Sequence, residues 1–142
     1  MGLYAHAKGL SEEECYDCGY ITYGHFMMNL AETAYGKEMG DVYKRCQYGW
    51  DKEFGYNYKW TQEDCDFWNA RCNDDLDLLL MHSDCDGKFT PQQCRKIYNA
   101  IKDLKMDMVG HNYVIMKPYN MLEHWNNIFY HCATRRVNLY YS

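Results

Sequence analysis

The clearest helix start in the chain is the stretch Thr90-Pro91-Gln92-Gln93. Thr90 suits the N-cap position, Pro91 suits the first helical position, and Gln93 completes a capping box from the third. Apolar side chains then recur every three or four residues, which is the spacing of one buried helix face. That face consists of Cys94, Ile97, Tyr98, Ile101 and Leu104. Residues 90–104 therefore predict an amphipathic helix that packs on a core.

A second amphipathic pattern lies directly before this helix. Thr61 is a candidate N-cap residue, and acidic side chains follow it in the first helical turn, where the helix dipole favours them. The apolar stripe that follows is Cys65, Trp68, Cys72, Leu76 and Leu79. Its spacing predicts one continuous helix from Thr61 to about His82.

Local patterns elsewhere predict further helices and one long loop. The stretch from Gln47 to Trp60 has no clear period and predicts a surface loop, and Val114 to Met116 predicts an extended segment. A capping box at Ser11 and Glu14 starts a short helix that should end at Cys18. The other predicted helices are Thr22 to Tyr35, a short one containing Met39 to Cys46, and a last one that Pro118 opens and that buries Met121, Trp125, Ile128 and Cys132.

Both ends of the chain alternate apolar with polar side chains, as a strand with one buried face does. Near the N-terminus the alternation runs from Leu3 to Ala7, and near the C-terminus from Val137 to Tyr141. We expect these two strands to pair. With no repeat and no linker, the sequence predicts a single domain over residues 1–142, of α+β class and mainly α: a helical bundle with a small β element.

The composition limits the class of protein. The chain is 47% hydrophobic and 25% charged, which is typical of a globular domain. A net charge of −5 argues against nucleic-acid binding through phosphates. No apolar run is long enough for a membrane span, and no secretory leader is visible, so we expect a cytoplasmic chain without a membrane partner. The 15 tyrosines either replace Phe in the core or form a binding surface.

The eight cysteines are expected to be free, because a reducing compartment keeps thiols reduced, and most should be buried as small apolar groups. Cys15 and Cys18 have the spacing of zinc ligands, with His25 as a third candidate. A structural zinc site usually has a second cysteine pair, so two packed thiols on a short helix are the alternative.

The segment between the two clearest helices is His82-Ser83-Asp84-Cys85-Asp86-Gly87-Lys88-Phe89-Thr90-Pro91-Gln92-Gln93. It resembles an EF-hand calcium loop, with Gly87 at the sharp turn, Asp84 and Asp86 at two ligand positions, and Phe89 where an EF-hand has its pairing strand. The first position is His82 and the last is Gln93, where EF-hands have acidic residues. The resemblance implies a degenerate calcium site formed by His82, Asp84, Asp86 and Gln93. The donor set of His82 with Asp84 and Asp86 would instead suit a softer metal such as zinc. A purely structural turn is the alternative.

A wider stretch, from Asp74 to Gly87 together with Arg135-Arg136-Val137-Asn138-Leu139-Tyr140, is similar to a loosely defined group of small uncharacterised bacterial and phage proteins. The similarity covers about the C-terminal half of the chain. It implies no activity.

The last helix has a second, polar face. Side chains that can donate hydrogen bonds recur along it, without a carboxylate: Lys117, Asn120, His124, Asn127, His131 and Arg135, followed by Arg136. Such a stripe is a candidate site for a phosphate or another anionic group. A solvated helix face is the alternative.

No catalytic motif is present, so the sequence favours a protein that is not an enzyme. We expect a small cytosolic binding or inhibitor protein of the bacterial or phage accessory type. Its partner would be a host protein or a small anionic, nucleotide-like ligand, and it would act as a monomer or as a homo-oligomer. The alternative is a protein that binds a divalent metal through the His82–Gln93 loop or through Cys15 and Cys18.

Overall fold

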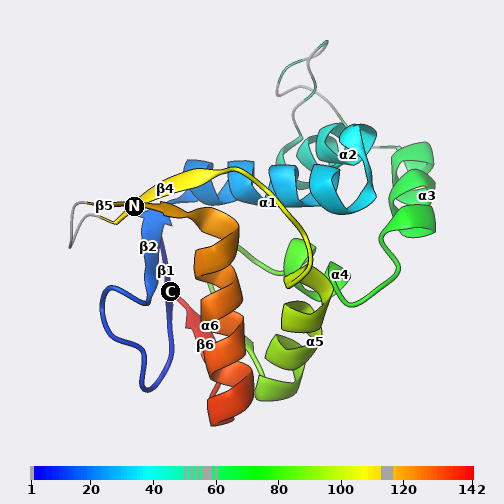
Figure 1. Cartoon of the computed structure of the whole chain (residues 1–142). Coiled ribbons are helices and arrows are strands. Elements are labelled where there is room, and N and C mark those ends of the chain that lie inside the picture. The colour runs from blue at the N-terminus through cyan, green and yellow to red at the C-terminus, as the bar shows by residue number, and fades with distance from the viewer. Residues whose placement is uncertain are drawn as a thin grey trace.

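A computed structural model describes residues 2–49, 51, 53, 55, 59, 61–112 and 117–142. The elements in chain order are β1 (Gly2–His6), β2 (Tyr16–Gly19), α1 (Tyr20–Tyr35), α2 (Lys37–Tyr48), α3 (Gln62–Arg71), α4 (Asp77–Leu80), β3 (Lys88–Phe89), α5 (Pro91–Ile101), β4 (Val109–Asn112), β5 (Lys117–Asn120), α6 (Met121–Arg135) and β6 (Leu139–Tyr141). Figure 1 shows two groups of helices: α1 and α2 lie together, with α3 beside them, and α5 and α6 form a second pair that runs across the direction of α1.

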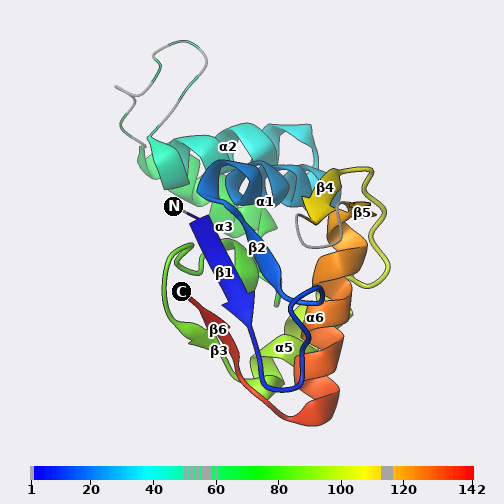
Figure 2. The ribbon, with the colours of Figure 1, turned by 90° about the vertical axis from the view of Figure 1, so that its left-hand side faces the viewer.

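Both ends of the chain belong to one antiparallel sheet with the strand order β2-β1-β6-β3. Ala5 pairs with Tyr141, and His6 pairs with Tyr140, so the predicted pairing of the termini is confirmed. Figure 2 shows this sheet facing the viewer, with α5 and α6 behind it. A second, two-stranded sheet joins β4 and β5. The α+β, mainly α class is also confirmed.

The predicted helix from Ser11 to Cys18 is wrong. The capping box does form, because Ser11 donates its backbone N–H to Glu14 Oε1 at 2.9 Å and Glu14 donates its N–H to Ser11 Oγ at 3.3 Å. It closes only one turn, and the chain then enters β2, whose four residues pair with β1. Burial of Tyr16 against the core and a full strand ladder outweigh the local helix signal.

The single helix predicted from Thr61 to about His82 is interrupted. Helix α3 begins with the expected Thr61 cap and ends at Cys72, where the backbone leaves the helical region. Asp74 Oδ1 then accepts a hydrogen bond from the N–H of Leu76 at 3.2 Å. Short acidic side chains compete in this way with helical hydrogen bonds, so they end α3 before α4 begins. The predicted apolar stripe still faces the core, with Trp68, Cys72, Leu76 and Leu79 buried.

The last helix begins later than predicted. Pro118 lies in β5, and the N-cap residue of α6 is Asn120, which accepts a hydrogen bond from the N–H of Glu123 at 2.9 Å. The β4–β5 hairpin before it was not predicted. Its turn, including the segment predicted to be extended at residues 114–116, lies outside the described residues. Of the predicted loop from 47 to 60, the first two residues end α2, Asp51 and Gly55 form a tight turn, and much of the rest also lies outside.

The other predicted helices are confirmed, except that α5 ends at Ile101, which leaves Leu104 outside the helix and only half-buried. Helix α5 has both hydrogen bonds of the Thr90–Gln93 capping box and begins with Pro91. Helices α1 and α2 are separated by Gly36, whose φ of 107° suits a residue without a side chain. Within the described residues, every helix is too short or too polar to cross a membrane.

All eight cysteines are free thiols. Four are buried, three are half-buried and Cys85 is exposed, so the expectation of mostly buried thiols holds fully for only half of them. Tyrosine takes the place of phenylalanine at several central core positions, as one reading of the composition predicted; the buried ones are Tyr16, Tyr23, Tyr43 and Tyr141.

One hydrogen bond in this core joins α1 to the C-terminal strand, and it gives a test of the fold. The hydroxyl groups of Tyr23 and Tyr141 lie 2.9 Å apart and are buried. Tyr141→Phe should lower the free energy of unfolding by about 1–2 kcal/mol, because it leaves the Tyr23 hydroxyl without this partner. The double variant Tyr23→Phe, Tyr141→Phe should lose less than the sum of the single variants. Denaturant titration measures both effects.

Tyr140→Phe is the matched control, since this neighbouring strand residue is 43% exposed. Its unfolding free energy should stay within about 0.5 kcal/mol of the original. Equal effects of Tyr141→Phe and Tyr140→Phe would show that the buried hydroxyl pair does not stabilise the sheet.

Candidate functional site

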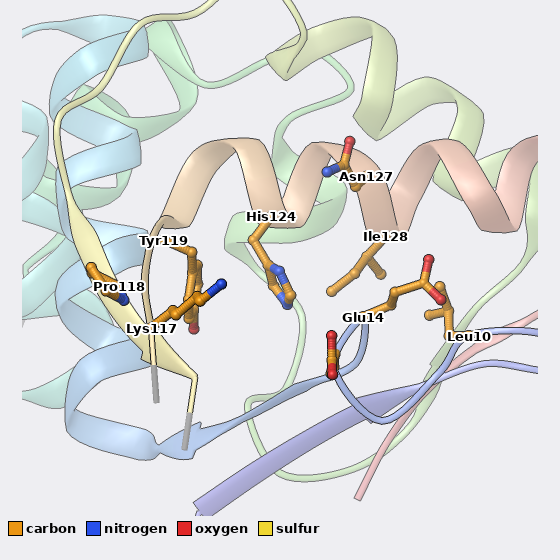
Figure 3. Close-up of a pocket in the computed structure, with 9 residues that line it drawn as sticks. Leu10, Glu14, Lys117, Pro118, Tyr119, His124, Asn127 and Ile128 are labelled. Carbon is orange, nitrogen blue, oxygen red and sulfur yellow. The ribbon is translucent and has the colours of Figure 1, made fainter. Parts of the chain in front are cut away.

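A cavity of about 280 Å³ opens at the N-terminal half of α6, between that helix, β5 and the loop that joins β1 to β2. Figure 3 shows His124 between Lys117 and Tyr119 on one side and Leu10 and Glu14 on the other. The lining is Leu10, Glu13, Glu14, Lys117, Pro118, Tyr119, His124, Asn127 and Ile128. Three of the predicted ligand-binding residues, Lys117, His124 and Asn127, therefore lie in one cavity.

His124 lies in the middle of this lining. Its Nε2 is 3.0 Å from the carbonyl oxygen of Cys15, and its ring centroid is 4.6 Å from that of Tyr119. A carbonyl oxygen only accepts, so Nε2 carries the proton. Burial lowers the pKa of His124. The ring is therefore neutral at pH 7, and its Nδ1 is left as an acceptor.

The carboxylates of the cavity come from the β1–β2 loop. Hydrogen bonds from the backbone and side chain of Ser11 lower the pKa of Glu14, with smaller contributions from His131 and His124. Glu13 lies beside it in the cavity wall. The predicted stripe has no carboxylate along α6 itself, but the fold adds two acidic side chains to it. A ligand that is purely anionic does not match this lining.

Two of the predicted residues hold the structure together around the cavity. Asn120 caps α6 and also donates its side-chain N–H to the carbonyl oxygen of Met106 at 3.0 Å. His131 Nε2 donates to the carbonyl oxygen of Lys8 at 2.9 Å. Gly9 has a φ of 90°, and a Cβ on it would lie 3.1 Å from the His131 ring, so this loop fits closely onto α6. The polar stripe thus anchors the β1–β2 loop along much of its length.

Arg135 and Arg136 lie at the far end of α6 and do not line this cavity. Both are exposed, and Arg136 is the C-cap residue, with a φ of 55°. The structure therefore divides the predicted anionic-ligand site into two separate regions of the same helix.

The EF-hand-like loop is a compact turn in which two of the four candidate ligands, His82 and Gln93, have other partners. Gly87 has a φ of 95°, as the sharp turn predicted. His82 Nδ1 lies 2.8 Å from the carbonyl oxygen of Ser83, Nε2 lies 3.2 Å from that of Lys88, and Gln93 Oε1 accepts from the N–H of Thr90. The strand at Phe89 pairs with β6. Calcium or zinc binding here, like the EF-hand resemblance itself, stays a prediction.

The Cys15 and Cys18 pair differs from its prediction. Cys18 lies in a strand and not on a helix, and Cys15 lies just before that strand. The third candidate, His25, is exposed on α1. In the parts of the chain that the structure describes, no three His, Cys, Asp or Glu side chains gather where they could hold a metal ion.

Several cavity residues stand out in the sequence, but nothing in the sequence indicates that they lie close together in the fold. Ser11 and Glu14 stand out as a capping box, yet nothing local places that turn against α6, which is more than 100 residues away. Leu10 and Tyr119 carry no pattern of their own, and Pro118 stood out only as the start of a helix, whereas it lies in β5. The pairing of β1 with β2 and the hydrogen bonds from His124 and His131 bring the loop onto the helix.

The lowered pKa of His124 predicts how stability depends on pH. An unfolded chain takes up the His124 proton near the ordinary value of about 6.5, whereas the folded chain takes it up only at lower pH. Folding should therefore lose stability as the pH falls below about 6.5, and the loss should level off below the folded pKa. His124→Gln keeps a donor for Cys15 but does not titrate, so its unfolding free energy should depend less on pH in this window.

Denaturant titrations of both proteins from pH 7.5 to pH 5 measure the difference, since the other histidines are common to both. Identical pH profiles would show that His124 is not the buried neutral group described above. The contribution of Glu14 to the unfolding free energy changes in a different pH range from that of His124. A carboxylate with a lowered pKa loses its stabilising effect only as the pH falls below about 4.5.

Comparison of the chain with family models, with curated proteins and with solved structures finds no match.

Proposed function

We propose that this protein binds a small organic ligand in the cavity between α6, β5 and the β1–β2 loop, and that it acts as a binding protein and not as an enzyme. The observation that supports this most directly is the mixed lining, in which an ammonium group and carboxylates flank a neutral imidazole over an apolar floor. Small-molecule sites are concave and combine apolar surface with a few convergent polar groups, and this cavity has both.

The lining indicates the chemical class of the ligand. Leu10, Tyr119 and Ile128 supply apolar surface for a compact apolar or aromatic body. Lys117 suits an anionic group, and Glu14 suits an amine or another hydrogen-bond donor. The ligand is therefore zwitterionic, or polar at both ends, which narrows the anionic ligand predicted from the polar stripe alone.

The state of the titratable groups favours binding over catalysis. The lowered pKa of the Glu14 carboxyl makes it a weak base, and its Oε1 already accepts from the N–H of Ser11. The Nε2 proton of His124 is held by a backbone carbonyl oxygen. Glu14 is therefore suited to accepting hydrogen bonds and not to taking a proton from a substrate, and the free Nδ1 of His124 is an acceptor that faces the ligand.

Three probes with a common phenylethyl body test the proposal: phenylalanine has both charges, 3-phenylpropionate only the anion, and phenethylamine only the cation. Titration of the isotope-labelled protein, followed by NMR, should give saturable shifts at Tyr119, His124 and Asn127. Phenylalanine should bind most tightly, and each single-charge probe should lose about 5- to 10-fold in affinity, because one charge-assisted hydrogen bond is lost.

Charge-removing variants identify which end binds which group. Lys117→Gln should weaken 3-phenylpropionate but not phenethylamine, and Glu14→Gln should do the reverse while keeping the acceptor for Ser11. Lys105→Gln and Glu38→Gln, which remove exposed charges outside the cavity, are the matched controls. Shifts that do not saturate, or that the controls change as much, would overturn the proposal.

A further inference from the structure

We infer that a second surface, the groove between the start of α5 and the end of α6, docks an acidic, extended segment of a partner protein. The groove is lined by Pro91, Gln92, Arg95, Lys96, Ala133 and Arg136. It lies at the opposite end of α6 from the ligand cavity and shares no residue with it. The inference therefore does not depend on the proposed function.

The packing of α5 against α6 brings the charges together. The two helices run side by side in opposite directions, so the N-terminus of α5 meets the C-terminus of α6 (Figure 1). Arg95 and Lys96 lie in the second turn of α5, and Arg136 ends α6. Three cations from two segments 40 residues apart therefore line one groove.

The charge of this groove is unusual for the molecule. The chain has a net charge of −5, yet every charged side chain that lines the groove is positive. Among the described residues, neither Arg95 nor Lys96 nor Arg136 forms an ion pair with a carboxylate, and all three are exposed. Like charges gathered without counter-charges raise the local positive potential and favour an acidic partner.

Two tyrosines lie beyond one end of the groove on the same pair of helices. Tyr98 lies three residues after Arg95, and Tyr130 lies three residues before Ala133, so each is about one turn further along its helix. Their ring centroids are 5.3 Å apart, and Tyr130 is 51% exposed. Exposed tyrosine beside arginine is the composition that binding hot spots favour.

The shape favours an extended chain over a small ion. The groove has a volume of about 710 Å³, against about 280 Å³ for the ligand cavity, and it is shallow. The N-terminus of α5 offers few free backbone N–H groups to an anion in the groove. Position 91 is proline, which has no N–H, and the Thr90 side chain already accepts the hydrogen bond of the Gln93 N–H. An acidic segment with one apolar or aromatic residue matches the cations and the tyrosine pair. Nucleic acid matches less well, because the chain as a whole has a net charge of −5.

The test uses a fluorescent peptide of about eight residues, which spans about 27 Å when extended and so exceeds the length of α5, about 16 Å. It alternates Glu with Ser around one central Leu, and a control peptide has Gln in place of every Glu. Fluorescence anisotropy should show saturable binding of the acidic peptide only. The affinity should fall as salt is raised from about 50 to about 200 mM, because ions screen exposed charges.

Arg95→Glu combined with Arg136→Glu should weaken the peptide at least tenfold, and Tyr130→Ala should weaken it about threefold. Lys37→Glu, an equal change of charge on exposed α2, is the matched control and should have little effect. Absence of saturable binding, or equal weakening by Lys37→Glu, would overturn the inference. Tighter binding of a single-stranded RNA of similar length would also overturn it, in favour of a nucleic-acid site.

The same variants keep the two proposals distinguishable. Arg95→Glu with Arg136→Glu should leave the cavity's response to phenylalanine unchanged, which also shows that the double variant is folded. Lys117→Gln should leave peptide binding unchanged. Loss of both binding activities in either variant would contradict the assignment of two separate surfaces.

Discussion

The fold depends on the burial of one side chain, the indole of Trp125. It is fully buried, and its ring centroid lies 4.8 Å from that of Tyr16, 5.8 Å from that of Tyr23 and 6.1 Å from that of Tyr141. These three partners come from β2, α1 and β6, so one ring on α6 joins an edge strand and the C-terminal strand of the sheet to the first long helix. Aromatic rings bury large areas and stabilise each other through favourable geometry, so the strands and helices assemble around α6.

This central position gives each part of α6 a separate role. Its buried face carries Trp125 and the apolar core, and its polar face holds the β1–β2 loop through His124 and His131. The loop in turn supplies carboxylates to the ligand cavity. The C-terminal end contributes Arg136 to the basic groove. A residue on this helix can therefore affect stability, ligand binding or partner binding according to its turn and its face.

Predictions from short sequence motifs were correct where the hydrogen bonds involved join residues that are close in the sequence. The Thr90–Gln93 capping box formed as predicted, because its hydrogen bonds join residues three positions apart. The Ser11–Glu14 box also formed, but the helix after it did not, because β1 offered residues 16–19 a strand ladder. The Asp74 turn likewise interrupted a good apolar stripe. In both wrong helix predictions, the backbone formed hydrogen bonds outside a helix instead. The spacing of apolar residues alone does not reveal such alternative hydrogen bonds.

The sequence by itself determined the class of the fold, most of the buried helix faces and the pairing of the termini. These features depend on the spacing of apolar residues along the chain, which can be read without knowing the tertiary structure. It also marked Lys117, His124 and Asn127 as members of one polar stripe, although Lys117 lies in β5 and not on α6. Only the tertiary structure decided that Glu14 faces them and that Arg136 lies with Arg95 and Lys96 instead. Those contacts join segments far apart in the chain, and the packing of whole elements around Trp125 is what brings them together.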